Sequence, residues 1–227
     1  MPIIALVRPG CTDFDVENRI QGNLDLPLND AGRAQVAATI DQLAEWPLEA
    51  VFTSPVNPAR STAEAIADTL QLPLQVQVEL QNIDHGLWQG LSLEEIKRKS
   101  PKILKQWQES PELVRPPEGE TIQEALARAL SVLKKPMKRE VSFAIVTSDP
   151  LTTLLGCAIT SDRPEFENVT GCRGQDQLIA IYSTNGRIPA TDPDHPWRTQ
   201  AATGSLVSVS SENGSTPRWL NPTLATG

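Results

Sequence analysis

Histidine, cysteine and positive charge are scarce in this chain, and each shortage excludes a class of protein. The 227 residues include only two histidines and three cysteines. The cysteines are far apart and form no Cys-x-x-Cys pair, so the pattern predicts neither a disulfide framework nor a thiolate zinc site. The isolated His85 and His195 do not complete a metal site. We therefore expect free thiols, at Cys11, Cys157 and Cys172, and no metal or other cofactor.

The shortage of basic residues argues against polyanionic partners. There are 28 acidic and 20 basic residues, which gives a net charge of −8. Such a chain is repelled by phosphodiester backbones and anionic lipid headgroups. It also lacks any apolar run near 18 residues, and an expected first strand from Pro2 or Ile3 leaves no room for a cleaved leader. We expect a soluble cytoplasmic protein that neither binds nucleic acid nor inserts into a membrane.

The hydrophobic pattern alternates between strands and helices along the first 160 residues. Short apolar runs predict buried strands, whereas apolar residues spaced by three and four predict helices. Strands separated by helices require crossover connections, so the pattern indicates a three-layer αβα fold with a mainly parallel sheet. The expected strands are 3–8, 48–54, 74–80 and 141–148, and the expected helices are 29–46, 59–71, 93–109, 122–135 and 151–160.

Capping signals place several of these helix ends. Asn29 is a good N-cap, and the pairs Ser92 with Glu95 and Thr121 with Glu124 have capping-box spacing. We expect the helix that follows Thr121 to end before Pro136.

The composition changes beyond residue 160, so we divide the chain there. Residues 1–160 are expected to form the α/β core, and residues 161–227 a loop-rich part packed on the same domain. Strands are predicted at 177–184 and 204–211, with the long loop 186–203 between them. No repeat or low-complexity tract is present.

Five short blocks, in the same order and with the same spacing, resemble the histidine phosphatase superfamily, the phosphoglycerate mutase-like fold. The first block is LVRPGCTDFDVENRIQG, where the family has LVRHGET followed by Asn and R-x-Q-G. The others are TSPVNPARSTA, LQNIDHGLWQG, PPEGET and IVTSDPLTTLL. The resemblance implies a phosphoglycerate mutase-like α/β fold.

The resemblance also implies a reaction for which this chain lacks the side chains. In the family a histidine attacks phosphorus, two arginines and a second histidine hold the phosphoryl oxygens, and an acidic residue protonates the leaving group. The corresponding positions here are Pro9 for the nucleophile, Pro58 for the second arginine, Asn82 for the acid and Ser148 for the second histidine. None of these side chains can perform the family's role.

Other family positions keep their residues, and these are the expected ligand-binding residues. Asp15 replaces a phosphate-contacting asparagine and Asp149 follows Ser148, so we expect one arginine to face two carboxylates and to hold a dianionic phosphoryl group only weakly. The retained residues are Arg8, Gly10, Thr12, Arg19, Gln21 and Gly22.

We therefore expect a catalytically inactive relative without phosphatase or mutase turnover, which acts as a regulatory, assembly or protein-binding factor. Its partner would be another protein. The segment beyond residue 160, which carries Trp197 and Trp219, is the expected docking surface. Dimerisation is frequent among similar proteins, and this sequence leaves a homodimer open.

Two alternatives remain. The first is an active phosphatase or phosphomutase with a relocated nucleophile, either Cys11 or His85. The second is a sensor that uses Arg8 and Arg19 to bind a small carboxylate or another weak anion. A cation site built from Asp13, Asp15 and Asp149 is less favoured than a solvated acidic rim.

Overall fold

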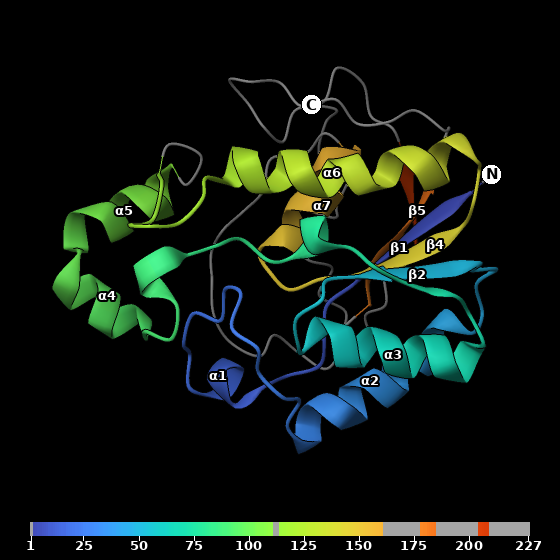
Figure 1. Cartoon of the computed structure of the whole chain (residues 1–227), viewed down its shortest axis with the longest axis horizontal. Helices are drawn as coiled ribbons and strands as arrows, with labels where there is room; N and C mark the ends of the chain where they lie inside the picture. Colours follow the sequence, from blue (N-terminus) through green and yellow to red (C-terminus); the bar gives the residue numbers. More distant parts are fainter. Residues whose placement is uncertain (1, 111–113, 161–177, 185–203, 209–227) are drawn as a thin grey trace, which may run out of the picture.

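The computed structural model describes residues 2–110, 114–160, 178–184 and 204–208, in which strands and helices alternate as predicted (Figure 1). The strands are β1 (Ile3–Val7), β2 (Ala50–Thr53), β3 (Leu74–Val76), β4 (Phe143–Val146), β5 (Leu178–Thr184) and β6 (Gly204–Ser208). The α-helices are α1 (Asp13–Val16), α2 (Asp30–Leu43), α3 (Ala59–Leu70), α4 (Leu93–Lys99), α5 (Pro101–Glu109), α6 (Ile122–Lys138) and α7 (Leu151–Thr160). Two short 3₁₀ helices are η1 (Val78–Leu80) and η2 (Gly86–Trp88).

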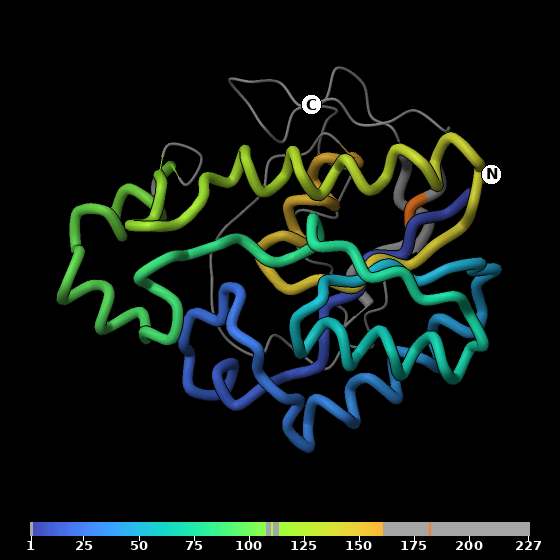
Figure 2. Tube along the Cα trace, viewed as in Figure 1, coloured from blue at the N-terminus to red at the C-terminus, as the bar shows by residue number. Residues whose placement is uncertain are grey.

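The described strands form one six-stranded sheet in the order β3-β2-β4-β1-β5-β6. β3, β2, β4 and β1 are parallel, whereas β5 and β6 are antiparallel additions at one side. In the chain trace, β1 from the N-terminus and β4 from beyond residue 140 lie side by side (Figure 2). The predicted α/β fold with a mainly parallel sheet is confirmed.

Helices cover both faces of this sheet, with α2 and α3 on one side and α6 and α7 on the other (Figure 1). Successive side chains of β1 point to opposite faces because a strand has a period of two. Ile4 and Leu6 pack with residues of α6 and α7, whereas Ala5 and Val7 pack with residues of α2 and α3. Both faces of the central strands are therefore apolar, which explains their continuous hydrophobic runs.

The single helix expected over 93–109 is wrong, because the structure has two helices there. α4 and α5 are separated at Ser100, whose φ of −142° and ψ of 56° are not helical. Proline restricts the residue before it to extended conformations, and Pro101 begins α5 as its first residue.

The strand expected over 74–80 is also shorter than predicted. β3 ends at Val76, and η1 follows. The carbonyls of Glu79 and Gln81 accept hydrogen bonds from Arg128 of α6, so this segment satisfies its backbone without a neighbouring strand.

The helix that we expected to end before Pro136 instead continues through it. Pro136 lies inside α6, in its last turn, and is buried together with Met137. The packing of these side chains offsets the one hydrogen bond that proline removes from the helix.

The remaining local predictions agree with the structure where it describes them. Asn29 caps α2 by accepting a hydrogen bond from the Gly32 amide, and the capping boxes of α4 and α6 are both formed. The predicted strands 177–184 and 204–211 correspond to β5 and β6. The loop 186–203 with Trp197, and Trp219, lie outside the described residues, as does the proposed docking surface that they carry. None of the helices described above has both the length and the apolar character needed to cross a membrane.

Candidate functional site

The candidate site lies at the edge of the sheet where β1, β2 and β4 end. These strands are parallel and in register, with Val7 opposite Val146, so the residues that follow them meet at one edge. β1 is followed by Arg8 and β4 by Ser148 and Asp149, while the segment after β2 leads to Pro58 at the start of α3. Ligands of open α/β sheets bind at this type of edge.

Arg8 and Asp149 form an ion pair at the centre of this edge. Arg8 Nη1 lies 3.1 Å from Asp149 Oδ2, and the two side chains are 22% and 25% exposed. The Nε of Arg8 is buried and makes no hydrogen bond to the described residues. Asp149 Oδ1 accepts a hydrogen bond of 2.9 Å from the hydroxyl of Thr153 on α7. The Arg8 guanidinium is therefore oriented by the bond from its Nη1 to Asp149, while its Nε–H remains an unused donor.

The turn after Arg8 is held by close backbone packing. A side chain at Gly10 would place its Cβ 2.3 Å from the carbonyl oxygen of Gly32 on α2, so only glycine fits. The Gly10 amide donates to Oγ1 of Thr62 on α3. Pro9, between Arg8 and Gly10, is buried. The turn thus fixes where Arg8 emerges, although Pro9 supplies no donor or nucleophile.

Asn82 lies at the same edge and has a structural role there. Its Nδ2 donates a hydrogen bond of 2.7 Å to the main-chain carbonyl of Asp149, and its Oδ1 accepts from the Leu151 amide at 3.4 Å. Ser148 is 7% exposed and Pro58 is buried. Through these two hydrogen bonds, Asn82 binds directly to the loop that carries Asp149.

Thr12 and Asp15 bind to each other at the start of α1. Both the amide and the hydroxyl of Thr12 donate to Asp15 Oδ2, at 2.7 and 2.8 Å. The expectation that Arg8 faces two carboxylates is therefore corrected, because Asp149 is its ion-pair partner and Asp15 turns to Thr12.

Arg19 binds a separate set of groups. Its Nε lies 2.6 Å from Oε2 of Glu17. Its Nη1 donates a hydrogen bond of 2.8 Å to the carbonyl of Gly90 and lies 3.9 Å from Oε2 of Glu95. A ligand-binding role for Arg19 beside Arg8 stays a prediction.

Gln21 and Gly22 form a turn beside this second set. Gly22 has a φ of +54°, and a Cβ there would lie 2.1 Å from Oε1 of Gln89. That oxygen also accepts a hydrogen bond from the Asn23 amide. The positive φ and the nearby Gln89 side chain favour glycine at position 22, and binding roles for Gln21 and Gly22 stay predictions.

His85 is not placed to act as a relocated nucleophile. It is 1% exposed, its Nδ1 bonds to the carbonyl of Ile83 at 3.0 Å, and its Nε2 is buried with no partner among the described residues. Its ring lies 5.5 Å from that of Trp107. Burial lowers the pKa of His85 from 6.5 to about 4, so the ring is neutral at pH 7. The same burial keeps substrate from reaching the ring.

Cys11 is also unsuited to that role, and the expectation of a free thiol there is wrong. Its sulfur is disulfide-bonded, and the residue is 5% exposed. A disulfide sulfur has no thiolate with which to attack phosphorus. Cys157 is a free cysteine and lies buried in α7. Cys172 and His195 lie outside the described residues.

The three carboxylates considered for a cation each have different partners. Asp13 accepts from Nδ2 of Asn29 at 3.4 Å, whereas Asp15 and Asp149 bind as described above. Across residues 2–110, 114–160, 178–184 and 204–208, no group of three His, Cys, Asp or Glu side chains could hold a metal ion.

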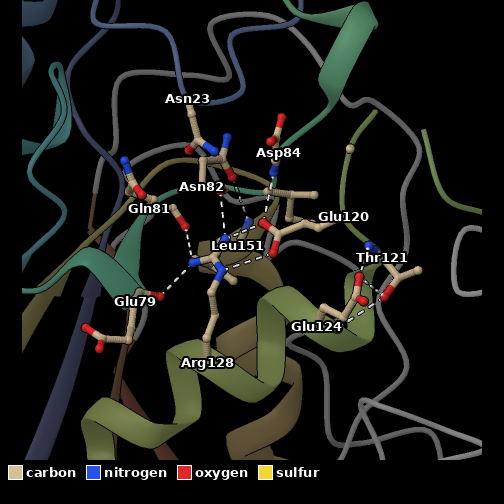
Figure 3. A network of polar contacts seen from close by, with 12 residues as sticks. Asn23, Glu79, Gln81, Asn82, Asp84, Glu120, Thr121, Glu124, Arg128 and Leu151 are labelled. Carbon is tan, nitrogen blue, oxygen red and sulfur yellow. Dashed lines mark hydrogen bonds and ion pairs between the residues drawn. The ribbon is translucent and has the colours of Figure 1, made fainter. Parts of the chain in front are cut away.

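One network at this edge was missed by the sequence predictions. Arg128 of α6 and Glu120 form an ion pair that also binds the segment 79–84 (Figure 3). The two residues are eight apart and Glu120 precedes the helix, so no helical pair spacing could reveal the contact.

Several known proteins with similar sequences or structures are phosphatases by name. The sequence model of the histidine phosphatase superfamily (branch 1) matches residues 4–172. Phosphoserine phosphatase 1 of Hydrogenobacter thermophilus is 29% identical over 143 residues, which cover 63% of this chain and 68% of that protein. Glucosyl-3-phosphoglycerate phosphatase of Mycolicibacterium vanbaalenii is 26% identical over 146 residues, which cover 64% of each chain. The matched segments thus span about two thirds of these relatives.

Solved structures agree in fold. The mycobacterial glucosyl-3-phosphoglycerate phosphatase in complex with VO₃ superposes with a TM-score of 0.70 and 22% identity, covering 90% of this chain and all of that one. YhfR of Bacillus stearothermophilus gives a TM-score of 0.71 with 22% identity, covering 91% and 95% of the two chains.

These relatives correct the functional expectation drawn from the sequence. We expected a catalytically inactive regulatory or protein-binding factor, but the two relatives described above are named as phosphatases. The substitutions at Pro9, Pro58, Asn82 and Ser148 were therefore given too much weight. They identify groups that this chain lacks at the family's positions, and they do not exclude hydrolysis by another route.

Proposed function

Because this chain belongs to branch 1 of the histidine phosphatase superfamily, we propose that it is a phosphatase that hydrolyses a small phosphomonoester at the edge formed by β1 and β4. The family relatives named as phosphatases favour this class of reaction. The observation that carries the assignment to this edge is the buried, unused Nε–H of Arg8, beside an Nη1 that Asp149 holds in place. A phosphoryl oxygen is a suitable acceptor for that donor.

The proposed reaction uses water as the nucleophile. Pro9 cannot attack, Cys11 is disulfide-bonded and His85 is closed to substrate. A water oxygen forms the new bond to phosphorus while the bond from phosphorus to the substrate alcohol breaks. The water proton passes to the carboxylate of Asp149, and solvent protonates the departing alkoxide. Arg8 binds the phosphoryl oxygens and stabilises the charge that develops on them.

The test is phosphate release by the purified protein from a panel of phosphomonoesters that includes phosphoserine, glucosyl-3-phosphoglycerate and p-nitrophenyl phosphate. Arg8→Ala should lower kcat/KM by about 100-fold or more, the usual effect of removing a group that stabilises transition-state charge. Arg33→Ala is the matched control, because Arg33 is an exposed arginine on α2 that pairs with Asp30.

Release by the wild-type protein, lost in Arg8→Ala and retained in Arg33→Ala, is the expected result. Equal release from all three proteins would place the chemistry elsewhere. Wild-type protein that releases no phosphate from any substrate of the panel would contradict the proposal.

A further inference from the structure

Arg128 uses every donor of its guanidinium to hold one segment of the chain. Its Nη1 donates to the carbonyls of Glu79 and Gln81, both at 2.6 Å, and its Nη2 donates to the carbonyl of Asn82 at 2.8 Å (Figure 3). The remaining donors, Nε and the second hydrogen of Nη2, bind the two carboxylate oxygens of Glu120. Three carbonyls close together in the chain thus converge on one side chain of α6.

Glu120 orients this guanidinium and binds the other end of the same segment. Glu120 Oε1 also accepts a hydrogen bond of 2.9 Å from the Asp84 amide, and the main-chain amide of Glu120 donates to the Asp84 carbonyl. The side chains of Arg128 and Glu120 are 24% and 19% exposed. Residues 79–84 are therefore held at one end by Arg128 of α6 and at the other by Glu120, which lies just before α6.

The held segment binds in turn to the loop that carries Asp149. The Asn82 side chain bridges the carbonyl of Asp149 and the amide of Leu151. A second tie comes from the hydroxyl of Thr147, which donates to the carbonyl of Leu80 at 2.7 Å. A continuous series of hydrogen bonds therefore runs from Arg128 through Asn82 to Asp149, and from Asp149 to Arg8.

We propose that Arg128, oriented by Glu120, is a positioning residue for the Arg8–Asp149 pair. It sets the place of Asn82, and Asn82 sets the place of the loop 149–151. The catalytic part of this inference depends on the proposed phosphatase function, whereas the positioning itself does not. Arginine is needed because a lysine has three donors on one atom and cannot bind three carbonyls and a carboxylate in this planar arrangement.

Arg115 provides a matched control for this inference. Like Arg128 it pairs with a glutamate, in this case Glu124 of α6 at 2.6 Å, and it binds a carbonyl, that of Gly119. Its hydrogen bonds and its ion pair go to Gly119 and Glu124 and not to residues 79–84, and its side chain is more exposed, at 53%. Arg115→Met should therefore remove a comparable ion pair without loosening the site.

Amide hydrogen exchange tests the positioning without depending on activity. In Arg128→Met, the amides of Asp84 and Leu151 should exchange at least tenfold faster, while that of Ile145 in β4 should change much less. Arg128→Lys should give an intermediate rate. In Arg115→Met, the Asp84 and Leu151 amides should exchange as in the wild type. If the amides of Leu151 and Ile145 exchange faster by the same factor in Arg128→Met, the variant has lost global stability and the proposal is overturned. An unchanged exchange rate of the Leu151 amide would overturn it as well.

Phosphate release then tests the catalytic part. Arg128→Met should lower kcat/KM about tenfold or more, since small displacements of positioned groups cost rate, and Arg128→Lys should recover part of that loss. Unchanged kcat/KM together with faster Leu151 exchange would overturn the link to catalysis. A wild-type protein that releases no phosphate would refute the proposed function, and the exchange rates would still decide whether Arg128 positions the loop.

Discussion

Asn82 donates a hydrogen bond of 2.7 Å from its side chain to the main-chain carbonyl of Asp149, across 67 positions of the sequence. The Asn82 side chain thus connects the segment after β3 with the loop after β4. This contact is compatible with an amide and not with a carboxylate, since only the amide has hydrogens to donate.

Replacing Asn82 by the isosteric aspartate should therefore destabilise the fold. Asn82→Asp removes the donor and places a negative charge against the Asp149 carbonyl, which should lower the free energy of unfolding by about 1–3 kcal/mol. Urea denaturation at pH 7 measures this change. Gln75→Glu, the same change of chemistry on an exposed residue of β3, should alter the free energy of unfolding by less than about 0.5 kcal/mol. Equal effects of the two substitutions would show that the hydrogen bond from Asn82 contributes nothing.

Asp149→Asn should move ligand affinity and turnover in opposite directions. The substitution removes the negative charge beside Arg8, so inorganic phosphate should bind about tenfold more tightly. It also removes the proposed proton acceptor, so kcat should fall by about 10²–10⁴-fold. Isothermal titration with phosphate and phosphate-release kinetics measure the two effects. A rise in kcat would show that Asp149 only opposes substrate binding.

His85 should make stability depend on pH between about 6.5 and 4. Burial lowers its pKa in the folded state to about 4, so the unfolded chain binds a proton first as the pH falls from 6.5. The free energy of unfolding should decrease over this range by up to about 3 kcal/mol. The comparison is urea denaturation at several pH values, in which His85→Phe should show a flatter profile than the wild type. A steep profile in His85→Phe would assign the effect to other groups.

Glu124 should contribute stability that is lost at lower pH. The hydrogen bond from the Thr121 amide, followed by the contact with Arg115, lowers the pKa of Glu124 from 4.5 to about 2. The contribution is therefore complete above about pH 4.5 and disappears as the pH falls through 2. Because the side chain is 51% exposed, Glu124→Gln should cost only about 0.5–1 kcal/mol at pH 7.

The measurement is the difference in unfolding free energy between wild type and Glu124→Gln at pH 7 and near pH 2. The difference should become much smaller near pH 2, where about half of the folded molecules have a protonated Glu124. Glu45→Gln, at an exposed position, is the control and should cost little at either pH. A difference that persists undiminished near pH 2 would mean that the charge of Glu124 is not its source.

Sequence patterns predicted the fold well because its elements are locally determined. Continuous apolar runs marked β1, β2 and β4, and capping residues marked the starts of α2, α4 and α6. The errors arose where tertiary contacts override local preference. Arg128 satisfies the carbonyls that a longer β3 would otherwise use, and the burial of Pro136 keeps α6 intact beyond the point where proline usually ends a helix.

The candidate site was predictable only in part. Arg8, Asn82 and Asp149 were all singled out through the resemblance of the blocks that contain them to the family's motifs. Asp149 was also expected to face Arg8, whereas the hydrogen bond from Asn82 to the Asp149 carbonyl was not predicted, because a contact across 67 positions depends on tertiary packing. The burial of His85 has no signal in the local sequence, whereas the contact of Asp15 with Thr12 has one that was not used, the capping-box spacing of the two residues.

The affinity of the protein for inorganic phosphate, with and without Arg8, tests the account most directly. Isothermal titration of wild type, Arg8→Ala and Arg33→Ala under identical conditions requires no knowledge of the substrate. We predict that Arg8→Ala weakens phosphate binding at least tenfold, whereas Arg33→Ala binds as the wild type does. Equal affinity of wild type and Arg8→Ala, or no measurable binding by the wild-type protein, would contradict the claim that Arg8 is the phosphoryl-binding group of this site.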